Sequence, residues 1–270
     1  MHTLIFKKVR FLFGSLALTF ISSSHGSVLV EPFSSKGDYK ISIKWQILDT
    51  DAENLQKALT TIKDKESKLH LNMIHLDSTG GSQTAALQIS KIIKNNKLNT
   101  YIAPTSSCVS ACSFIFISGV QRYGFGKIGV HSTTFKEDAY IDEKYISYVV
   151  ENNIENVTKF VKEQRISPDF ATAILNTPFW TMRYLTDTEK VNWNVNGIDR
   201  VESEILAIEI AKVRRISRSE MKSFIDRHYY ECFEQVKFLK ETAWECLKTK
   251  KIDESWIDKL RTKLNYFYQW

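Results

Sequence analysis

Three short segments carry the residues that could do chemistry. They are residues 77–81 (Asp-Ser-Thr-Gly-Gly), 108–112 (Cys-Val-Ser-Ala-Cys) and 129–131 (Gly-Val-His). Each stands where an apolar run begins or ends, which predicts the end of a strand or the start of a helix. If these ends meet at one edge of a sheet, they bring together a serine hydroxyl, an imidazole and free peptide N–H groups. Those are the parts of a nucleophilic hydrolase.

Each segment also has a plain structural interpretation. The Gly80 and Gly81 pair suits a tight turn, although free N–H groups before a helix also bind anions. Ser110 suits a helix N-cap, but a serine at a helix start also lies where the helix dipole favours negative charge. His131 suits a core histidine bonded to a carbonyl, yet a neutral imidazole is the base that an unactivated serine needs.

The elements around these segments alternate in type. Apolar periodicity predicts strands at residues 39–48, 69–76, 99–103 and 127–132, and helices from residue 49, at 84–94 and at 111–118. Such alternation indicates β-α-β units with a largely parallel sheet. Sheets of this kind usually bind ligands at the carboxyl ends of their strands, where all three segments are expected.

In this order, the three segments resemble the proteolytic subunit of Clp protease and its crotonase-like relatives, especially the exported bacterial Clp-protease-like proteins. The matching residues are the Ser-Thr-Gly-Gly run at 78–81, Ser110 before a buried helix, and His131 at a strand end. The resemblance covers roughly residues 41–202, and Thr79 departs from the usual proline. It implies an α/β fold built as a repeated β-α-β spiral, and serine peptidase activity.

The resemblance also implies a role for each residue of the site. Ser110 would be the nucleophile and His131 the general base. The backbone N–H groups of Gly81 and Ala111 would form the oxyanion hole. In related membrane-bound signal peptide peptidases a lysine is the base, and Lys127 lies in the right region, but His131 is the better match.

The third member of the family's triad is an acid that orients the histidine. It normally precedes an aromatic-Leu-Ser/Thr segment, here residues 184–189, but residues 176–182 contain no carboxylate. We take Asn176 as the tentative orienting residue, because an amide does this in papain-like sites. Asp169 is a more distant candidate, and Asp187 is interpreted as a helix cap.

Two other functions compete with a peptidase. A missing acid also suits a binding or scaffolding protein with a degenerate site, and the same fold would suit a crotonase-like acyl hydrolase with an acyl-CoA pocket. For a peptidase we expect peptide or unfolded protein substrates, no cofactor and no ATPase partner, because residues 119–127 miss the spacing of a phosphate-binding loop. No metal site is expected either, because no zinc-finger-like spacing occurs.

The four cysteines suit an oxidising compartment. Cys232 and Cys246 are the plausible structural pair. Cys108 and Cys112 flank Ser110, and within one regular helix they would be too far apart for an unstrained disulfide. If Cys108 instead belongs to the preceding turn, a disulfide would hold Ser110 in place.

The whole chain is predicted to divide into three parts: a signal peptide at residues 1–26, the α/β domain at 27–202 and a helical extension at 203–270. Basic residues followed by a short apolar run indicate a periplasmic or secreted protein, with an N-terminal anchor as the alternative. A net charge of +6 without a recognition motif predicts no nucleic acid partner. Membrane contact is expected only through the signal or the extension.

The helix at 137–163 resembles the family's oligomerisation helix and implies a homo-oligomer.

Overall fold

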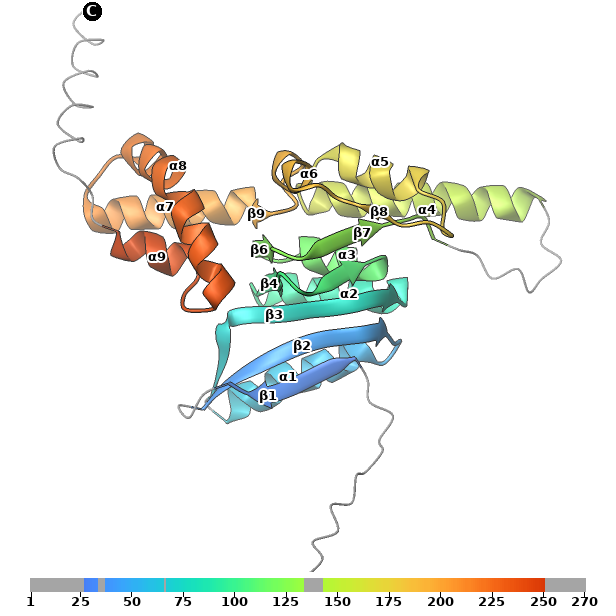
Figure 1. Ribbon diagram of the computed structural model, residues 1–270, viewed down its shortest axis with the longest axis horizontal. Helices are drawn as coiled ribbons and strands as arrows, with labels where there is room; N and C mark the ends of the chain where they lie inside the picture. Colours follow the sequence, from blue (N-terminus) through green and yellow to red (C-terminus); the bar gives the residue numbers. More distant parts are fainter. Residues whose placement is uncertain (1–26, 34–36, 66, 134–142, 251–270) are drawn as a thin grey trace, which may run out of the picture.

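The computed structural model describes residues 27–33, 37–65, 67–133 and 143–250. The predicted signal peptide therefore lies outside the described residues, as does the end of the extension. The described strands form one sheet in the order β8-β7-β5-β3-β4-β6-β9, and β2 joins it by pairing with both β3 and β1 (Figure 1).

The strands are β1 (Val28–Pro32), β2 (Asp38–Ile47), β3 (Lys68–Gly81), β4 (Asn99–Ile102), β5 (Ser107–Val109), β6 (Gln121–Gly124), β7 (Lys127–Val130), β8 (Arg183–Tyr184) and β9 (Gly197–Ile198). The helices are α1 (Asp51–Asp64), α2 (Gln83–Asn95), α3 (Ala111–Ile117), α4 (Glu143–Glu163), α5 (Pro168–Asn176), α6 (Asp187–Asn192), α7 (Arg200–Arg214), α8 (Arg218–Gln235) and α9 (Ala243–Thr249). A short 3-10 helix, η1 (Val236–Phe238), follows α8.

The centre of the sheet is parallel and its edges are antiparallel. One edge of β3 pairs in parallel with β2. At its other edge, the first half of β3 pairs in parallel with β4 and the second half with β5. β4 then pairs in parallel with β6, and β5 pairs in parallel with β7. The predicted α/β class with β-α-β units is therefore confirmed. Because β3 is shared, the sheet divides into two branches, of which β3-β5-β7 carries the three segments singled out above.

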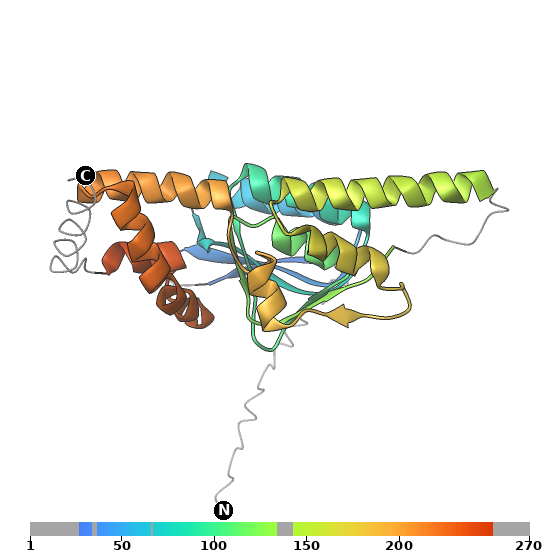
Figure 2. The same cartoon turned by 90° about the horizontal axis from the view of Figure 1, so that it is seen from above.

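One face of the sheet holds the main core. Side chains alternate across β2, so that Ile41 and Ile43 point to the same side, and both are buried with Ile74 of β3. Ile89 of α2 and Ile115 of α3 pack into the same cluster. In Figures 1 and 2, α1, α2 and α3 all lie on one side of the sheet.

Helix α4 runs past the end of the sheet (Figure 2). It packs into the core through Val157 and Val161 near its C-terminal end, whereas Tyr148 and Ile154, nearer its start, are exposed. Such a helix has the form that an oligomerisation element needs. The predicted homo-oligomer stays a prediction.

The C-terminal extension packs against the β4-β6 branch of the sheet. Met73, Tyr101 and Tyr123 form a second apolar cluster with residues of α7 to α9, including Trp244. The hydroxyl of Tyr123 accepts a hydrogen bond from the backbone N–H of Ala243 at 3.1 Å. The predicted helical extension is confirmed, and none of the helices that the structure describes is long and apolar enough to cross a bilayer.

The sequence and the structure differ at three places. The apolar residues at 198–201 predict a short strand, but the strand ends at Ile198, because the Asp199 side chain accepts the N–H groups of Val201 and Glu202 and starts α7. Apolar spacing at 233–247 predicts one helical run, but this run breaks at Leu239, which has a left-handed φ of 52°. The predicted boundary at residue 203 lies within α7.

Candidate active site

Neighbouring strands bring the three segments to one end of the sheet. Ser78 of β3 pairs with Cys108 of β5, and Val109 pairs with Gly129 of β7. The N–H of Ser110 donates to the carbonyl of Gly129 at 2.9 Å, so that the hydrogen-bonding pattern continues past β5. Ser110 and His131 therefore directly follow the ends of two adjacent parallel strands. Among the hydrogen bonds of the described residues, none joins their side chains.

Ser110 occupies a sharp turn between β5 and α3. Its backbone has φ 56° and ψ −129°, a left-handed conformation that costs a residue other than glycine about 1 to 3 kcal/mol. The side chain makes no capping hydrogen bond, although the residue stands at the N-cap position of α3. The hydroxyl is thus left available, as it is in the strained strand-to-helix turns that hold nucleophilic serines.

The glycine pair lies against this turn. Gly80 has φ +88°, and a Cβ built on it would lie 2.6 Å from the Ser110 Cβ and 2.8 Å from the Val109 carbonyl oxygen. Only a residue without a side chain permits so close an approach. β3 extends through Gly81, so the pair ends a strand rather than forming the expected turn, and Ser82 caps α2 by accepting the Ala85 N–H at 3.2 Å.

Of the two proposed oxyanion donors, Ala111 lies next to the glycine pair. Ala111 begins α3, and the first N–H groups of a helix have no partner within it. Its nitrogen lies 3.1 Å from the position that a Cβ on Gly80 would take. Ser78 braces the glycines, since its hydroxyl donates to the Trp45 carbonyl and accepts the Gly80 N–H at 3.1 Å. The roles of Gly81 and Ala111 stay predictions.

The imidazole of His131 is held by the adjacent peptide. Its Nδ1 lies 2.8 Å from the carbonyl oxygen of Ser132. Because a carbonyl only accepts hydrogen bonds, Nδ1 carries the proton and a neutral ring keeps its lone pair on Nε2. The Ser132 N–H in turn donates to the Thr177 carbonyl at 2.8 Å. This is the tautomer that a general base acting through Nε2 requires.

The candidates for a third triad member lie apart from this contact. Asn176 is exposed at the end of α5, and Nδ1 of His131 is already bonded to Ser132. The Asp169 carboxylate accepts the Ser167 hydroxyl at 3.0 Å, and that of Asp187 pairs with Lys190 at 2.9 Å. In the described part of the chain none of these three side chains bonds to His131.

Lys127, the alternative base, stands at the other end of its strand. It begins β7, whereas His131 follows the last residue of β7. Its ammonium group lies 5.9 Å from the centre of the Tyr184 ring. This position gives no support to a lysine base.

A disulfide joins the two elements that flank Ser110. Cys108 lies in β5 and Cys112 in α3, with their Cα atoms 5.2 Å apart. Because Cys108 belongs to the strand and not to the helix, the pairing that would hold Ser110 in place is the one observed. The second predicted pair, Cys232 and Cys246, is also bonded.

Replacing both Cys108 and Cys112 with serine should lower the free energy of unfolding by about 2 kcal/mol, because the disulfide closes only a short loop. The serine turn would also lose its covalent brace, so any reactivity of Ser110 should fall with stability. Urea unfolding measures the loss of stability, and the rate at which an active-site label reacts with the folded protein measures the loss of Ser110 reactivity. The matched control replaces Cys232 and Cys246, which should cost about 3 kcal/mol and leave the reactivity of the folded protein unchanged. Equal loss of reactivity in both variants would contradict a local role.

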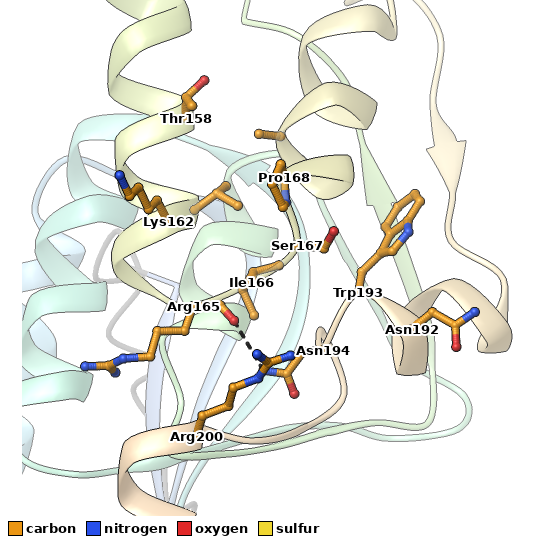
Figure 3. A pocket seen from close by; sticks show the side chains of 12 residues that line it. Thr158, Lys162, Arg165, Ile166, Ser167, Pro168, Asn192, Trp193, Asn194 and Arg200 are labelled. Atoms are coloured by element: carbon orange, nitrogen blue, oxygen red, sulfur yellow. Dashed lines mark hydrogen bonds between the residues drawn. The ribbon is translucent and has the colours of Figure 1, made fainter.

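A cavity of about 610 Å³ opens elsewhere, between α4, α5 and the start of α7 (Figure 3). Neither Ser110 nor His131 lines it. Its Arg165 is paired with Asp199 at 2.7 Å, and the Arg165 carbonyl accepts the Asn194 side-chain amide at 3.3 Å. These contacts tie α4 to α7 and do not form part of the candidate active site.

Comparisons with known proteins agree with the predicted family. The family model described as Clp protease matches residues 34–126. No curated protein matches the chain. Two similar solved structures are both of the 1510-N membrane-bound stomatin-specific protease. One is a serine-to-alanine mutant, and the other is a lysine-to-alanine mutant in complex with a substrate peptide.

The likeness to these structures is distant. Both are 18% identical to this chain and cover 57% of it, with 75% and 71% of their own chains covered and TM-scores of 0.42 and 0.41. The family match rests on the sequence itself and includes the glycine pair and Ser110. Residues 34–126 are therefore similar to the Clp protease family, and this similarity supports a peptidase.

Proposed function

We propose that this protein is a serine peptidase in which Ser110 is the nucleophile and His131 the general base. One observation carries the proposal. A serine with an uncapped side chain and a left-handed backbone follows one strand, and a histidine with its Nδ1 bonded follows the adjacent parallel strand. A strained serine beside a histidine with a free Nε2 has a chemical use but no evident structural one.

In the proposed mechanism, Nε2 of His131 takes the hydroxyl proton as Ser110 Oγ attacks the substrate carbonyl. The N–H groups of Gly81 and Ala111 bind the oxyanion, and each such donor is typically worth about 3 kcal/mol to the transition state. The imidazolium then protonates the leaving amine as the C–N bond breaks. Nε2 of His131 then removes a proton from water as the water oxygen attacks the ester carbonyl. The bond from the acyl carbon to Ser110 Oγ breaks, and the imidazolium returns its proton to Oγ as the acid leaves.

The Ser132 carbonyl takes the place of the missing acid in this proposal. It fixes the tautomer of His131 and stabilises the imidazolium by accepting the Nδ1–H. A neutral carbonyl stabilises a positive charge less than a carboxylate does. We therefore expect a slower enzyme than one with a complete triad, acting on peptides or unfolded proteins without ATP. The proposed compartment is the periplasm or the exterior, which suits the two disulfides.

The test is labelling of residues 27–270, with both disulfides formed, by a fluorophosphonate probe. We expect the probe to react with the wild type at Ser110, as located by peptide mass mapping, and not with Ser110→Ala. The matched control is Ser132→Ala, which removes a neighbouring hydroxyl but keeps the backbone carbonyl, so labelling should persist. Circular dichroism checks that each variant is folded. Absence of labelling in folded, oxidised wild type would leave a binding protein on a protease-like scaffold.

A further inference from the structure

The face of the sheet opposite the main core carries a second group of polar side chains. Lys40, Ser42 and Lys44 alternate along β2 with the buried Ile41 and Ile43, and therefore point to the other side of the sheet. Across the strand pair, Ser42 lies beside His75 and Lys44 beside Asp77. None of these residues takes part in the proposed catalysis.

These side chains surround a cavity of about 160 Å³ between β2, β3 and β4. The residues that line it are Lys40, Ser42, Lys44, His75, Leu76, Asp77, Tyr101, Ala103 and Ser106. A space of this size suits a single small group, since sites for cofactors and drug-sized ligands usually measure about 300 to 1,000 Å³.

Two polar atoms of this group have no hydrogen-bond partner among the residues that the structure describes. They are the Oγ of Ser42 and the Nε2 of His75, in residues that are 1% and 8% exposed. Buried polar groups nearly always have a partner, and those that do not call for an unseen water or ion. Here both orphan groups come from residues that line the same cavity.

The surrounding charge favours an anion over water. Lys40 and Lys44 are half-buried and form no ion pair among the described residues. Asp77 is the carboxylate in the lining; it is exposed, and its Oδ1 accepts the Ser107 N–H at 3.0 Å. Burial, and then Lys40, His70 and Lys44, lower the pKa of His75 to about 3. The ring is therefore neutral at pH 7 and lies in a positive field.

The Tyr101 side chain closes the cavity on the β4 side. Its ring meets the His75 ring edge-on at 5.1 Å, and its hydroxyl donates to the Lys237 carbonyl at 3.3 Å. That hydroxyl is therefore already engaged with the C-terminal extension. The groups left to receive a ligand include the Ser42 hydroxyl, the His75 ring nitrogen and two ammonium groups.

We propose that this cavity binds a small oxyanion, of the class of phosphate, sulfate or carboxylate, through Ser42, His75, Lys40 and Lys44. The hydroxyl and the ring Nε2–H each donate one hydrogen bond, and the two lysines neutralise the charge. A water molecule would satisfy the two orphan atoms but would bring no negative charge to the two half-buried ammonium groups, which form no ion pair among the described residues. The inference is independent of the proposed peptidase activity.

The experiment is a titration of residues 27–270 with inorganic phosphate at pH 7, at ionic strength held constant with sodium chloride. The ring resonances of His75, assigned with a His75→Gln variant, report binding directly in an NMR spectrum. We expect a saturable shift in the wild type and in Ser110→Ala. The variant Lys40→Gln with Lys44→Gln should bind at least about tenfold more weakly, since charge-assisted hydrogen bonds are lost.

Two further variants keep the test decisive. Ser42→Ala loses no hydrogen bond of the folded protein and should stay folded, yet it should bind phosphate several-fold more weakly. Lys63→Gln with Lys91→Gln removes the same charge from exposed positions on α1 and α2 and should leave binding unchanged. Parallel titrations with sulfate and acetate show whether a tetrahedral anion or a carboxylate is preferred. No saturable shift with any of the three, or equal weakening by both lysine pairs, would overturn the proposal.

Discussion

Replacing His131 with alanine should lower the rate of fluorophosphonate labelling, and of any peptide hydrolysis, by about 10⁴ to 10⁶. The expected loss is this large because a serine hydroxyl is a poor nucleophile until a base removes its proton. The rate of labelling under excess probe measures the effect without knowledge of the natural substrate. Peptide hydrolysis, once a substrate is found, should fall in proportion.

Asn176→Ala is the informative control for this experiment. If the Ser132 carbonyl orients the imidazole, removal of the exposed Asn176 amide should change the rate less than about threefold, within the range of a surface substitution. A loss in Asn176→Ala comparable with that in His131→Ala would show that the amide moves onto the imidazole in the active state. An unchanged rate in His131→Ala would exclude histidine as the base.

Gly80→Ala should impair both folding and reactivity. A left-handed backbone costs an alanine about 1 to 2 kcal/mol, and overpacking adds about 1 to 3 kcal/mol. The new methyl group would meet the Ser110 Cβ at 2.6 Å, so the serine turn must shift. Misplacement of a reacting group by about 1 Å can cost about 100-fold in rate. Urea unfolding and labelling of the remaining folded protein measure the two losses separately.

Gly37→Ala separates backbone strain from the local clash. Gly37 has φ +83°, close to the +88° of Gly80, but within the described part of the chain a Cβ there would approach only the Ser67 hydroxyl, at 4.0 Å. It should therefore lose about 1 to 2 kcal/mol of stability and label at the normal rate. If Gly80→Ala labels as fast as Gly37→Ala, the contact between Gly80 and the serine turn has no catalytic importance.

The sequence predicts the main elements well because most of them bury a regular apolar face. The alternation of Ile41, Ile43, Trp45 and Ile47 predicts β2, although Trp45 is exposed in the structure and has a left-handed φ of 59°. The spacing of Ile89 and Ile93 belongs to an amphipathic helix. It does not predict β5, which is three residues long and too short to show a period. That strand decides the cysteine pairing, because it places Cys108 outside α3.

The candidate site could be predicted only in part. The glycine pair, Ser110 and His131 are recognisable by type and order, but the partner of the His131 Nδ1 is a backbone carbonyl, which every residue has. No residue type signals such a group, so the sequence predicts a side chain, Asn176, in its place. The orphan atoms of Ser42 and His75 escape the sequence for another reason. The two residues are far apart in the sequence and become neighbours only because the register of β2 and β3 pairs them.

The backbone of Ser110 also bears on how such a protein would lose its chemistry. A glycine in its place would relieve most of the cost of the left-handed conformation and would leave the turn intact. In a lineage that no longer used the hydroxyl, this single substitution would be a gain in stability. Selection for stability would therefore favour glycine at this position once the hydroxyl had no function. A chain that keeps the serine keeps the less stable turn.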